Sequence, residues 1–280
     1  MSKVKTATAG LITRIERIME IDNIYNMDCL EGMKQIPDGT IDAVICDLPY
    51  GTTACAWDSV IPLEPLWEQY RRVLKHQGSV LLFGSEPFST MLRMSNLDWY
   101  KYDWIWQKNV PTGFQHAKNM PLKDFEIISV FSAAGMGHAN LLGDNRMIYN
   151  PQGLTPCHIV KNGKTSFNNT VGARPSHKDI VVRELENYPR MILHYDSQSG
   201  EGANNNRIHP TQKPVDLLRY LVLTYTNEGD TVLDNCMGSG TTAIACIKER
   251  RHFIGFELNK EYFDKAVRRI KAEQAQLTLF

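Results

Sequence analysis

The stretch AVICDLPYG, residues 43–51, ends an apolar run with an acid and an aromatic ring. Asp47 stands where the run stops, and Tyr50 follows shortly after it. Such an end presents a carboxylate, which accepts hydrogen bonds, beside a ring that can stack on another flat group. Pro49 fixes the turn between them and has no backbone N–H to compete with that of a substrate. The residue types fit either a binding site for a planar group or a plain strand-ending turn.

A second candidate site is the glycine-rich stretch VLDNCMGSGTTAIAC, residues 232–246, which predicts a strand, a tight turn and a helix. Gly238 and Gly240 let the backbone approach a ligand closely, and the helix N-terminus supplies free N–H groups for an anion. Glu257 ends the next predicted strand, 23 residues after Asp234. This spacing is close to the ~20-residue gap before an acid that binds ribose hydroxyls. The pair indicates a nucleoside-containing cofactor, whereas the turn alone fits a ligand-free connection equally well.

The elements that position these residues follow an α/β pattern, in which apolar runs alternate with amphipathic stretches. Strands are expected at residues 22–28, 40–47, 78–84, 99–108, 125–132, 230–235 and 252–257. Helices are expected at residues 63–75, 214–226, 259–276 and, after its glycine turn, within 238–250. Both candidate sites therefore follow a predicted strand directly.

The segment from residue 133 to residue 208 differs from this pattern, because it is rich in Gly, Asn, Ser, Pro and His. Residues 161–178 and 196–207 are predicted to be loops. The segment has eight Lys and Arg against six Asp and Glu, a net charge of +2. Long loops in a compact protein are usually functional or disordered, so this segment is a candidate functional insertion.

The composition limits the class of protein. The 280 residues fit one large domain, or one domain with an insertion, and 42% apolar residues allow a sizeable core. Lys and Arg number 31, as do Asp and Glu, so nucleic acid would have to bind at a local basic groove. Six cysteines without a CxxC pair indicate reduced intracellular thiols. No apolar run approaches the roughly 18 residues of a membrane span, and no secretory signal is evident, so we expect a cytoplasmic protein.

Four stretches together resemble the motifs of the amino-group DNA methyltransferases. DLPYG at 47–51 resembles the D-P-P-Y motif, and DNCMGSGTT at 234–242 resembles the D-P-F-x-G-S-G-T-T cofactor motif. RIHPTQKPVDLLRYLV at 207–222 resembles the H-P-T-Q-K-P segment, and residues 25–47 resemble the G-D-C-x-E stretch that leads into the catalytic strand. The catalytic motif comes before the cofactor motif, which is the order of the β-class.

The resemblance implies a mostly parallel, seven-stranded, Rossmann-like methyltransferase sheet with a polar target-recognition insertion. Residues 1–132 would form the catalytic part of the methyltransferase domain, 133–208 the target-recognition insertion, and 209–280 the cofactor-binding part. It also implies S-adenosylmethionine as the cofactor and double-stranded DNA as the partner.

For the catalytic motif, the resemblance implies contacts with a base that has left the duplex. The Asp47 carboxylate and the Leu48 backbone carbonyl would accept hydrogen bonds from its exocyclic amino group. These two acceptors would orient the nitrogen and favour the positive charge that develops on it. Pro49 would fix the turn, and Tyr50 would stack on the base.

For the cofactor, the resemblance implies that Glu257 binds the ribose hydroxyls. Asp28 would accept from the adenine amino group and Lys213 would pair with the methionine carboxylate, although a turn acid and a solvated helix start explain them too. The methionine part would be lined by the residues of the glycine-rich turn, with Ser239 and Thr241 as polar contacts: Asp234, Cys236, Gly238, Ser239, Gly240 and Thr241.

The chain departs from the family pattern at three positions. Leu48 replaces a proline, but the group that faces the substrate there would be a backbone carbonyl, so function should survive. Asn235 replaces a second proline, and Cys236 replaces the usual aromatic residue beside the cofactor. A thiol can still pack there, so we expect at most a modest loss of cofactor affinity.

The resemblance favours adenine N6 as the target, because cytosine-N4 members more often carry Ser at the position of Asp47. Cytosine N4 is the first alternative. A protein glutamine methyltransferase is a second, but those enzymes place the cofactor motif first. A catalytically dead nucleic-acid-binding module is a third. It predicts a damaged Asp47 or Tyr50, or a missing cofactor acid, whereas all three residues are present.

Two aromatic stretches have competing interpretations. Trp99, Trp104 and Trp106 alternate with polar residues, which favours a half-buried strand face over a base-stacking platform. Residues 108–119 combine basic, aromatic and amide side chains just after that strand. They are a candidate DNA-facing loop.

Metal binding is not expected. Cys157 and His158 lack a second pair at ligand spacing, and amino methylation needs no metal. His209, which begins HPTQKP, is interpreted as a structural cap. The sequence leaves open whether the protein forms a homodimer or works with a restriction endonuclease.

Overall fold

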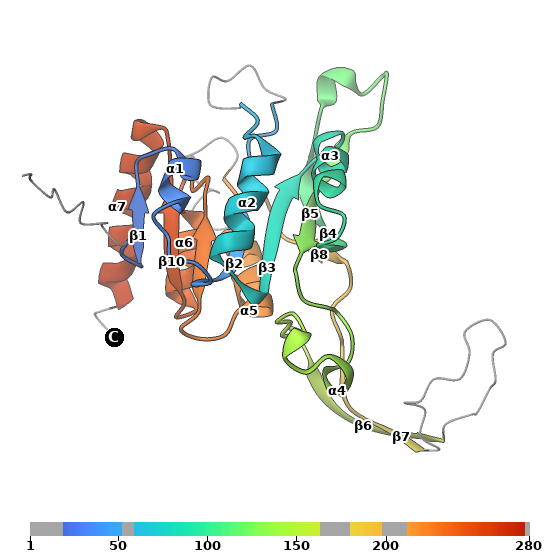
Figure 1. Ribbon diagram of the computed structural model, residues 1–280. Helices are drawn as coiled ribbons and strands as arrows, with labels where there is room; N and C mark the ends of the chain where they lie inside the picture. Colours follow the sequence, from blue (N-terminus) through green and yellow to red (C-terminus); the bar gives the residue numbers. More distant parts are fainter. Residues whose placement is uncertain (1–18, 52–58, 163–179, 198–211, 278–280) are drawn as a thin grey trace, which may run out of the picture.

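The computed structural model describes residues 19–51, 59–162, 180–197 and 212–277. Its main feature is an eight-stranded sheet with the order β1-β10-β9-β2-β3-β5-β4-β8 (Figure 1). The strands of this sheet are β1 (Asn23–Tyr25), β2 (Ile41–Cys46), β3 (Leu74–Gly84), β4 (Tyr100–Thr112), β5 (Lys123–Phe131), β8 (Ile192–His194), β9 (Thr231–Asp234) and β10 (His252–Phe256). A separate ribbon pairs β6 (Thr155–Asn162) with β7 (Ile180–Glu186).

The sheet is mostly parallel. β1, β10, β9, β2 and β3 run in one direction, and β5 is antiparallel to both β3 and β4. β2 and β9 are neighbours, although they come from opposite ends of the chain, with Ala43 opposite Val232 and Val44 opposite Leu233. The chain moves outward from this pair in both directions, and such a switch point is where open α/β sheets bind ligands.

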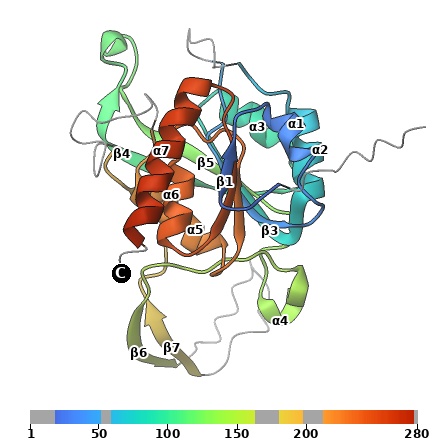
Figure 2. The same cartoon turned by 90° about the vertical axis from the view of Figure 1, so that its left-hand side faces the viewer.

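Helices cover both faces of the sheet, and the alternation of side chains along each strand feeds both cores (Figure 2). In β2, Val44 and Cys46 join one core cluster, while Ile45 joins the other. The first cluster contains residues of α1 (Cys29–Met33), α2 (Leu63–Val73) and α3 (Phe88–Ser95). The second contains residues of α5 (Val215–Tyr225), α6 (Thr241–Lys248) and α7 (Lys260–Leu277). The remaining short elements are η1 (Phe114–His116), α4 (Ala139–Leu142) and η2 (Gly143–Asn145).

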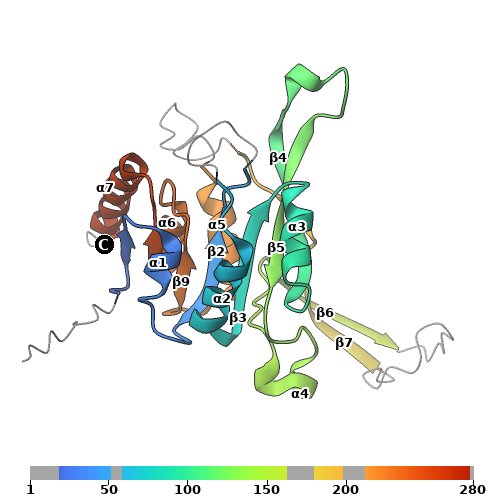
Figure 3. The ribbon, with the colours of Figure 1, turned by 45° about the horizontal axis from the view of Figure 1, so that its top comes forward.

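The fold class predicted from the sequence is confirmed, but the sheet has eight strands rather than seven. All seven expected strands are present, and the additional one, β8, comes from the segment 133–208. This segment also contributes the β6–β7 ribbon, which projects from the opposite end of the molecule from the β4–β5 hairpin tip (Figures 1 and 3). Hydrophobic patterning did not predict these strands, because the ribbon and the three-residue β8 lack long apolar runs. Most of the expected loops 161–178 and 196–207 lie outside the described residues, as does His209.

Of the three tryptophans predicted to share a strand face, Trp104 and Trp106 lie on one buried face of β4, whereas Trp99 precedes the strand and packs against the other core cluster. Trp104 and Trp106 are buried, and the indole N–H of Trp106 donates to the Tyr195 carbonyl at 2.8 Å. The Trp104 indole N–H donates to the Tyr225 hydroxyl at 2.6 Å, and the hydroxyls of Tyr102 and Tyr225 are 2.8 Å apart. This polar network fastens β4 to α5 inside the core. Among the described residues, no helix has the length and apolarity that crossing a membrane requires.

Replacing Tyr225 with phenylalanine should destabilise the fold. The change removes a buried hydroxyl and leaves the Trp104 N–H without its acceptor, a loss of about 1–3 kcal/mol. Urea unfolding followed by circular dichroism should show a lower midpoint with an unchanged slope. Tyr188→Phe is the matched control, because the Tyr188 side chain is exposed. Equal midpoints for the two variants would contradict a role for the network.

Candidate active site

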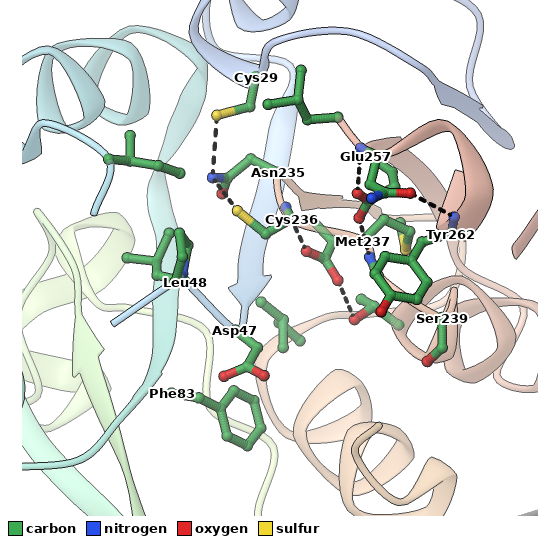
Figure 4. A pocket seen from close by; sticks show the side chains of 18 of the residues that line it. Cys29, Asp47, Leu48, Phe83, Asn235, Cys236, Met237, Ser239, Glu257 and Tyr262 are labelled. Carbon is green, nitrogen blue, oxygen red and sulfur yellow. Dashed lines mark hydrogen bonds between the residues drawn. The ribbon is translucent and has the colours of Figure 1, made fainter. Parts of the chain in front are cut away.

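The residues that follow the carboxyl ends of β2, β9 and β10 surround one cavity of about 620 Å³. This volume lies within the usual range of small-molecule sites. Residues 47–50 line it on one side, while residues of the glycine-rich turn and Glu257 line it on the other (Figure 4). The two stretches singled out in the sequence therefore face the same cavity.

Asp47 follows β2 directly, and both of its carboxylate oxygens have partners. Oδ1 accepts from the Tyr50 hydroxyl at 2.5 Å, and Oδ2 accepts from the Lys213 ammonium at 2.5 Å. The Tyr50 ring stacks on Phe88, with ring centroids 5.1 Å apart and planes at 29°. The acid and the ring of the DLPY stretch are thus held against one another at the edge of the cavity.

Glu126, a residue that sequence reasoning missed, extends this arrangement. It lies on β5, and its Oε2 is 3.3 Å from the Lys213 ammonium. Its Oε1 accepts from the Lys108 ammonium at 2.5 Å. Two acids and two lysines therefore form one largely buried cluster, which we call the Asp47–Lys213–Glu126–Lys108 cluster. A single acid within the apolar run FEIISVFS was the available signal.

The pKa values in this cluster follow from burial and from charge. Burial raises the pKa of Asp47, and the Glu126 carboxylate adds to the rise, which the Lys213 ammonium opposes. Burial acts in the same direction on Glu126, but the two lysines outweigh it and lower the pKa of that group. Burial disfavours the charged form of Lys213, but Asp47 and Glu126 outweigh it and raise the Lys213 pKa.

Lys213 is held by two acids at the edge of the cavity. Its ammonium lies between Asp47 and Glu126, and the salt bridge with a methionine carboxylate stays a prediction. Lys213 therefore belongs with the catalytic motif in this structure. Lys213, which lies just before α5, contacts Asp47 after β2 and Glu126 on β5. The sequence could not reveal this proximity.

Conformation explains the two glycines of the turn, but only one of them lines the cavity. Gly238 has φ 53° and Gly240 has φ 80°, in the left-handed region that favours glycine. A Cβ on Gly240 would lie 3.3 Å from the Ala266 Cβ on α7. Gly240 thus permits close packing of the turn against α7; the cavity lining includes its neighbours Ser239 and Thr241, and a contact of Gly240 with the cofactor stays a prediction.

Asp234 acts inside the turn. Its carboxylate accepts from the Cys236 backbone N–H at 3.0 Å and from the Thr242 hydroxyl at 2.6 Å. Burial raises the Asp234 pKa to about 6. The hydroxyls of Ser239 and Thr241 lie 3.0 Å apart, and both residues line the cavity.

Glu257 and Asp28 are held by backbone N–H groups. Glu257 accepts from Gly238 and from Asn259, each at 2.8 Å, and its pKa is raised by burial. Asp28 caps α1 by accepting from Leu30 at 2.9 Å and from the following residue at 3.1 Å. Both acids line the cavity, and Asp28 also has the turn-acid role that the sequence left open.

The departures from the family motifs are accommodated by packing. Leu48 is buried, and Asn235 accepts from the Tyr70 hydroxyl at 2.5 Å. The Asn235 amide also lies 3.6 Å from the Cys236 sulfur. Tyr262 on α7 lines the cavity too and had no sequence signal. No group of three or more His, Cys, Asp and Glu side chains that could hold a metal occurs among the described residues.

Comparison with known proteins identifies relatives of the chain. The model of a family described as DNA methylase, for N6 and N4 methylation, matches residues 41–268. The chain is 28% identical over 268 residues to the Type II methyltransferase M1.MboII of Moraxella bovis, covering 89% of this chain and 96% of the relative. It is 27% identical over 259 residues to the Type II methyltransferase M.HpaI of Haemophilus parainfluenzae, covering 88% and 73%.

A solved structure supports the same relationship. The M1.HpyAVI–SAM complex has a TM-score of 0.58 and 25% identity, covering 88% of this chain and 98% of that one. The family match spans the catalytic motif, the cofactor motif and the strands between them. This chain therefore belongs to the DNA methylase family, the S-adenosylmethionine-dependent enzymes that methylate amino groups of DNA bases at N6 or N4.

Proposed function

We propose that this protein transfers a methyl group to the N6 amino group of an adenine flipped out of duplex DNA, at a specific site. The observation that carries the proposal is the shared cavity. The cavity has a carboxylate acceptor and an aromatic ring on one side, and a glycine turn and an acid on the other. These are the groups needed to hold an amino-bearing ring and a nucleoside cofactor together.

The cofactor side of the cavity suits S-adenosylmethionine, which supplies the methyl group when bound. Glu257 is fixed by two backbone N–H groups, and its carboxylate can accept from ribose hydroxyls. Ser239 and Thr241 offer hydroxyls to the amino-acid part, and Asp28 offers a carboxylate to the adenine amino group. Apolar side chains such as Met237 complete the lining.

The substrate side of the cavity binds and orients the target base. Asp47, when ionised, accepts a hydrogen bond from the target amino group and favours the positive charge that develops on it. The Leu48 carbonyl is the second acceptor, and Tyr50, held against Phe88, offers its ring for stacking. Lys213 donates to Asp47 and opposes the rise in its pKa that burial causes.

We favour adenine over cytosine because Asp47 stands at the position where cytosine-N4 members of the family more often carry Ser. Residues 133–208 are proposed to contribute to recognition of the DNA site, and β8 from this segment pairs with β4 of the main sheet. Residues 1–132 and 209–280 supply the catalytic and cofactor-binding parts. Type II relatives support a site-specific enzyme.

The test is to incubate the purified protein with unmethylated bacteriophage DNA and methyl-labelled S-adenosylmethionine. Digestion to nucleosides and mass spectrometry identify the labelled base. We expect label in N6-methyladenine. Label in N4-methylcytosine would retain the mechanism but overturn the adenine proposal, and the absence of any labelled nucleoside would overturn DNA as the substrate.

Asp47→Ala should lower kcat about 100-fold or more, because it removes the acceptor for the target amino group. The Kd for S-adenosylmethionine, measured by calorimetry, should change little, since Lys213 retains Glu126 as a partner. Glu257→Ala is the matched comparison and should weaken cofactor binding. A similar loss of cofactor affinity in both variants would show that Asp47 is misassigned.

The pH profile of kcat/KM should reveal the charge cluster. Activity should fall at low pH as Asp47 becomes protonated, and burial places this loss above the pH range of an ordinary aspartate. Glu126→Gln removes a like charge and lowers the Asp47 pKa, so the acid limb should move to lower pH. Lys213→Met removes the opposing charge and should move it to higher pH. Shifts in the same direction would contradict the proposed electrostatics.

A further inference from the structure

The hairpin formed by β4 and β5 extends beyond the sheet (Figures 1 and 3). β4 is antiparallel to β5, and β5 is antiparallel to β3, so β4 runs in the same direction as β3 and β2. The end of β4 therefore lies at the same edge of the sheet as the end of β2, where Asp47 stands. The hairpin tip, residues 113–122, projects from the edge that carries the cavity.

The tip is an ordered turn that exposes large apolar side chains. His116 N–H donates to the Gly113 carbonyl at 2.9 Å, and Met120 N–H donates to the His116 carbonyl at 3.0 Å. Despite this order, Phe114 is 63% exposed and Met120 is 60% exposed. Single exposed apolar residues are common, but here two large ones occupy one projecting turn.

The charge of the hairpin favours a polyanion. Residues 108–123 contain three lysines and no acid. Lys108 is paired with Glu126 at the base of the hairpin, and Lys123 donates to the Ser85 hydroxyl. Lys118 lies at the tip itself and is exposed. A cationic turn with apolar side chains matches the chemistry of proteins that insert wedges into duplex DNA.

The hairpin is also continuous with the catalytic machinery. Glu126, which lines the cavity, sits opposite Trp106 at the base of the same two strands. The tip and the cavity thus lie at the same edge of the sheet, so a duplex whose base enters the cavity faces the side of the molecule from which the tip projects. Flipping a base leaves a gap in the stack, and the unstacking is costly unless something fills that gap.

We propose that the hairpin tip enters the DNA beside the target base, with Phe114 and Met120 filling the gap left by the flipped base and Lys118 contacting phosphate. This inference rests on the proposed function and adds a base-flipping element to it. The wedge acts on the flipping step, so its contribution to kcat/KM depends on how firmly the target base is paired.

The test compares Phe114→Ala with the wild-type protein on two duplexes. Both carry the site mapped by sequencing the DNA that the wild type methylates, and one has an abasic nucleotide opposite the target base. On the paired duplex, kcat/KM should fall about 10- to 100-fold, since a few kcal/mol of unstacking is no longer offset. On the abasic duplex, where the target is already unpaired, the variant should come within about threefold of the wild type.

Phe114→Leu should retain most of the activity on the paired duplex, because it keeps an apolar wedge. Ile21→Ala is the control, since Ile21 is 48% exposed just before β1, at the opposite edge of the sheet from β4. Urea unfolding of Phe114→Ala should match the wild type. Equal losses on both duplexes, or none on the paired one, would overturn the wedge while the methyltransferase function stands. A wild-type protein that labels no DNA nucleoside would overturn both.

Discussion

The pairing of β2 with β9 is the constraint on which the site depends. The two strands come from opposite ends of the chain, and their parallel register brings Ala43 opposite Val232. Because parallel strands end at the same edge, the turn after Asp47 and the turn after Asp234 must face a common space. The proposed substrate side and the proposed cofactor side are thus joined by the backbone hydrogen bonds of this strand pair, which would bring a methyl donor and its acceptor together in one cavity.

The second constraint is that the buried carboxylate of Asp47 needs a partner of opposite charge. An isolated carboxylate at the position of Asp47 would be costly to bury. Lys213 pairs with it and also contacts Glu126, which in turn pairs with Lys108. The cluster balances two negative and two positive groups and links β2, β4, β5 and the start of α5. Its burial is therefore compatible with an ionised Asp47, the state that the proposed chemistry uses.

The two long projections of the molecule have different relationships to the cavity. The β4–β5 hairpin continues strands of the main sheet and leaves it at the catalytic edge. The β6–β7 ribbon projects from the other end (Figure 3). The described residues of the segment 133–208, which the sequence predicts to be one insertion, include both this ribbon and β8, which returns to pair with β4. Distance along the chain does not indicate which parts adjoin the active site.

The sequence by itself determined the α/β class, seven strands of the main sheet and the two motifs at their ends, because these depend on local hydrophobic patterning and turn chemistry. The sequence also indicated Glu257 as the cofactor acid, since it ends the next predicted strand 23 residues after Asp234. It did not reveal that Lys213 contacts Asp47, that Glu126 shares this lysine, or that Gly240 packs against α7. Only the tertiary structure decided these contacts, because they join residues from distant strands and helices, and their distances depend on how the layers pack.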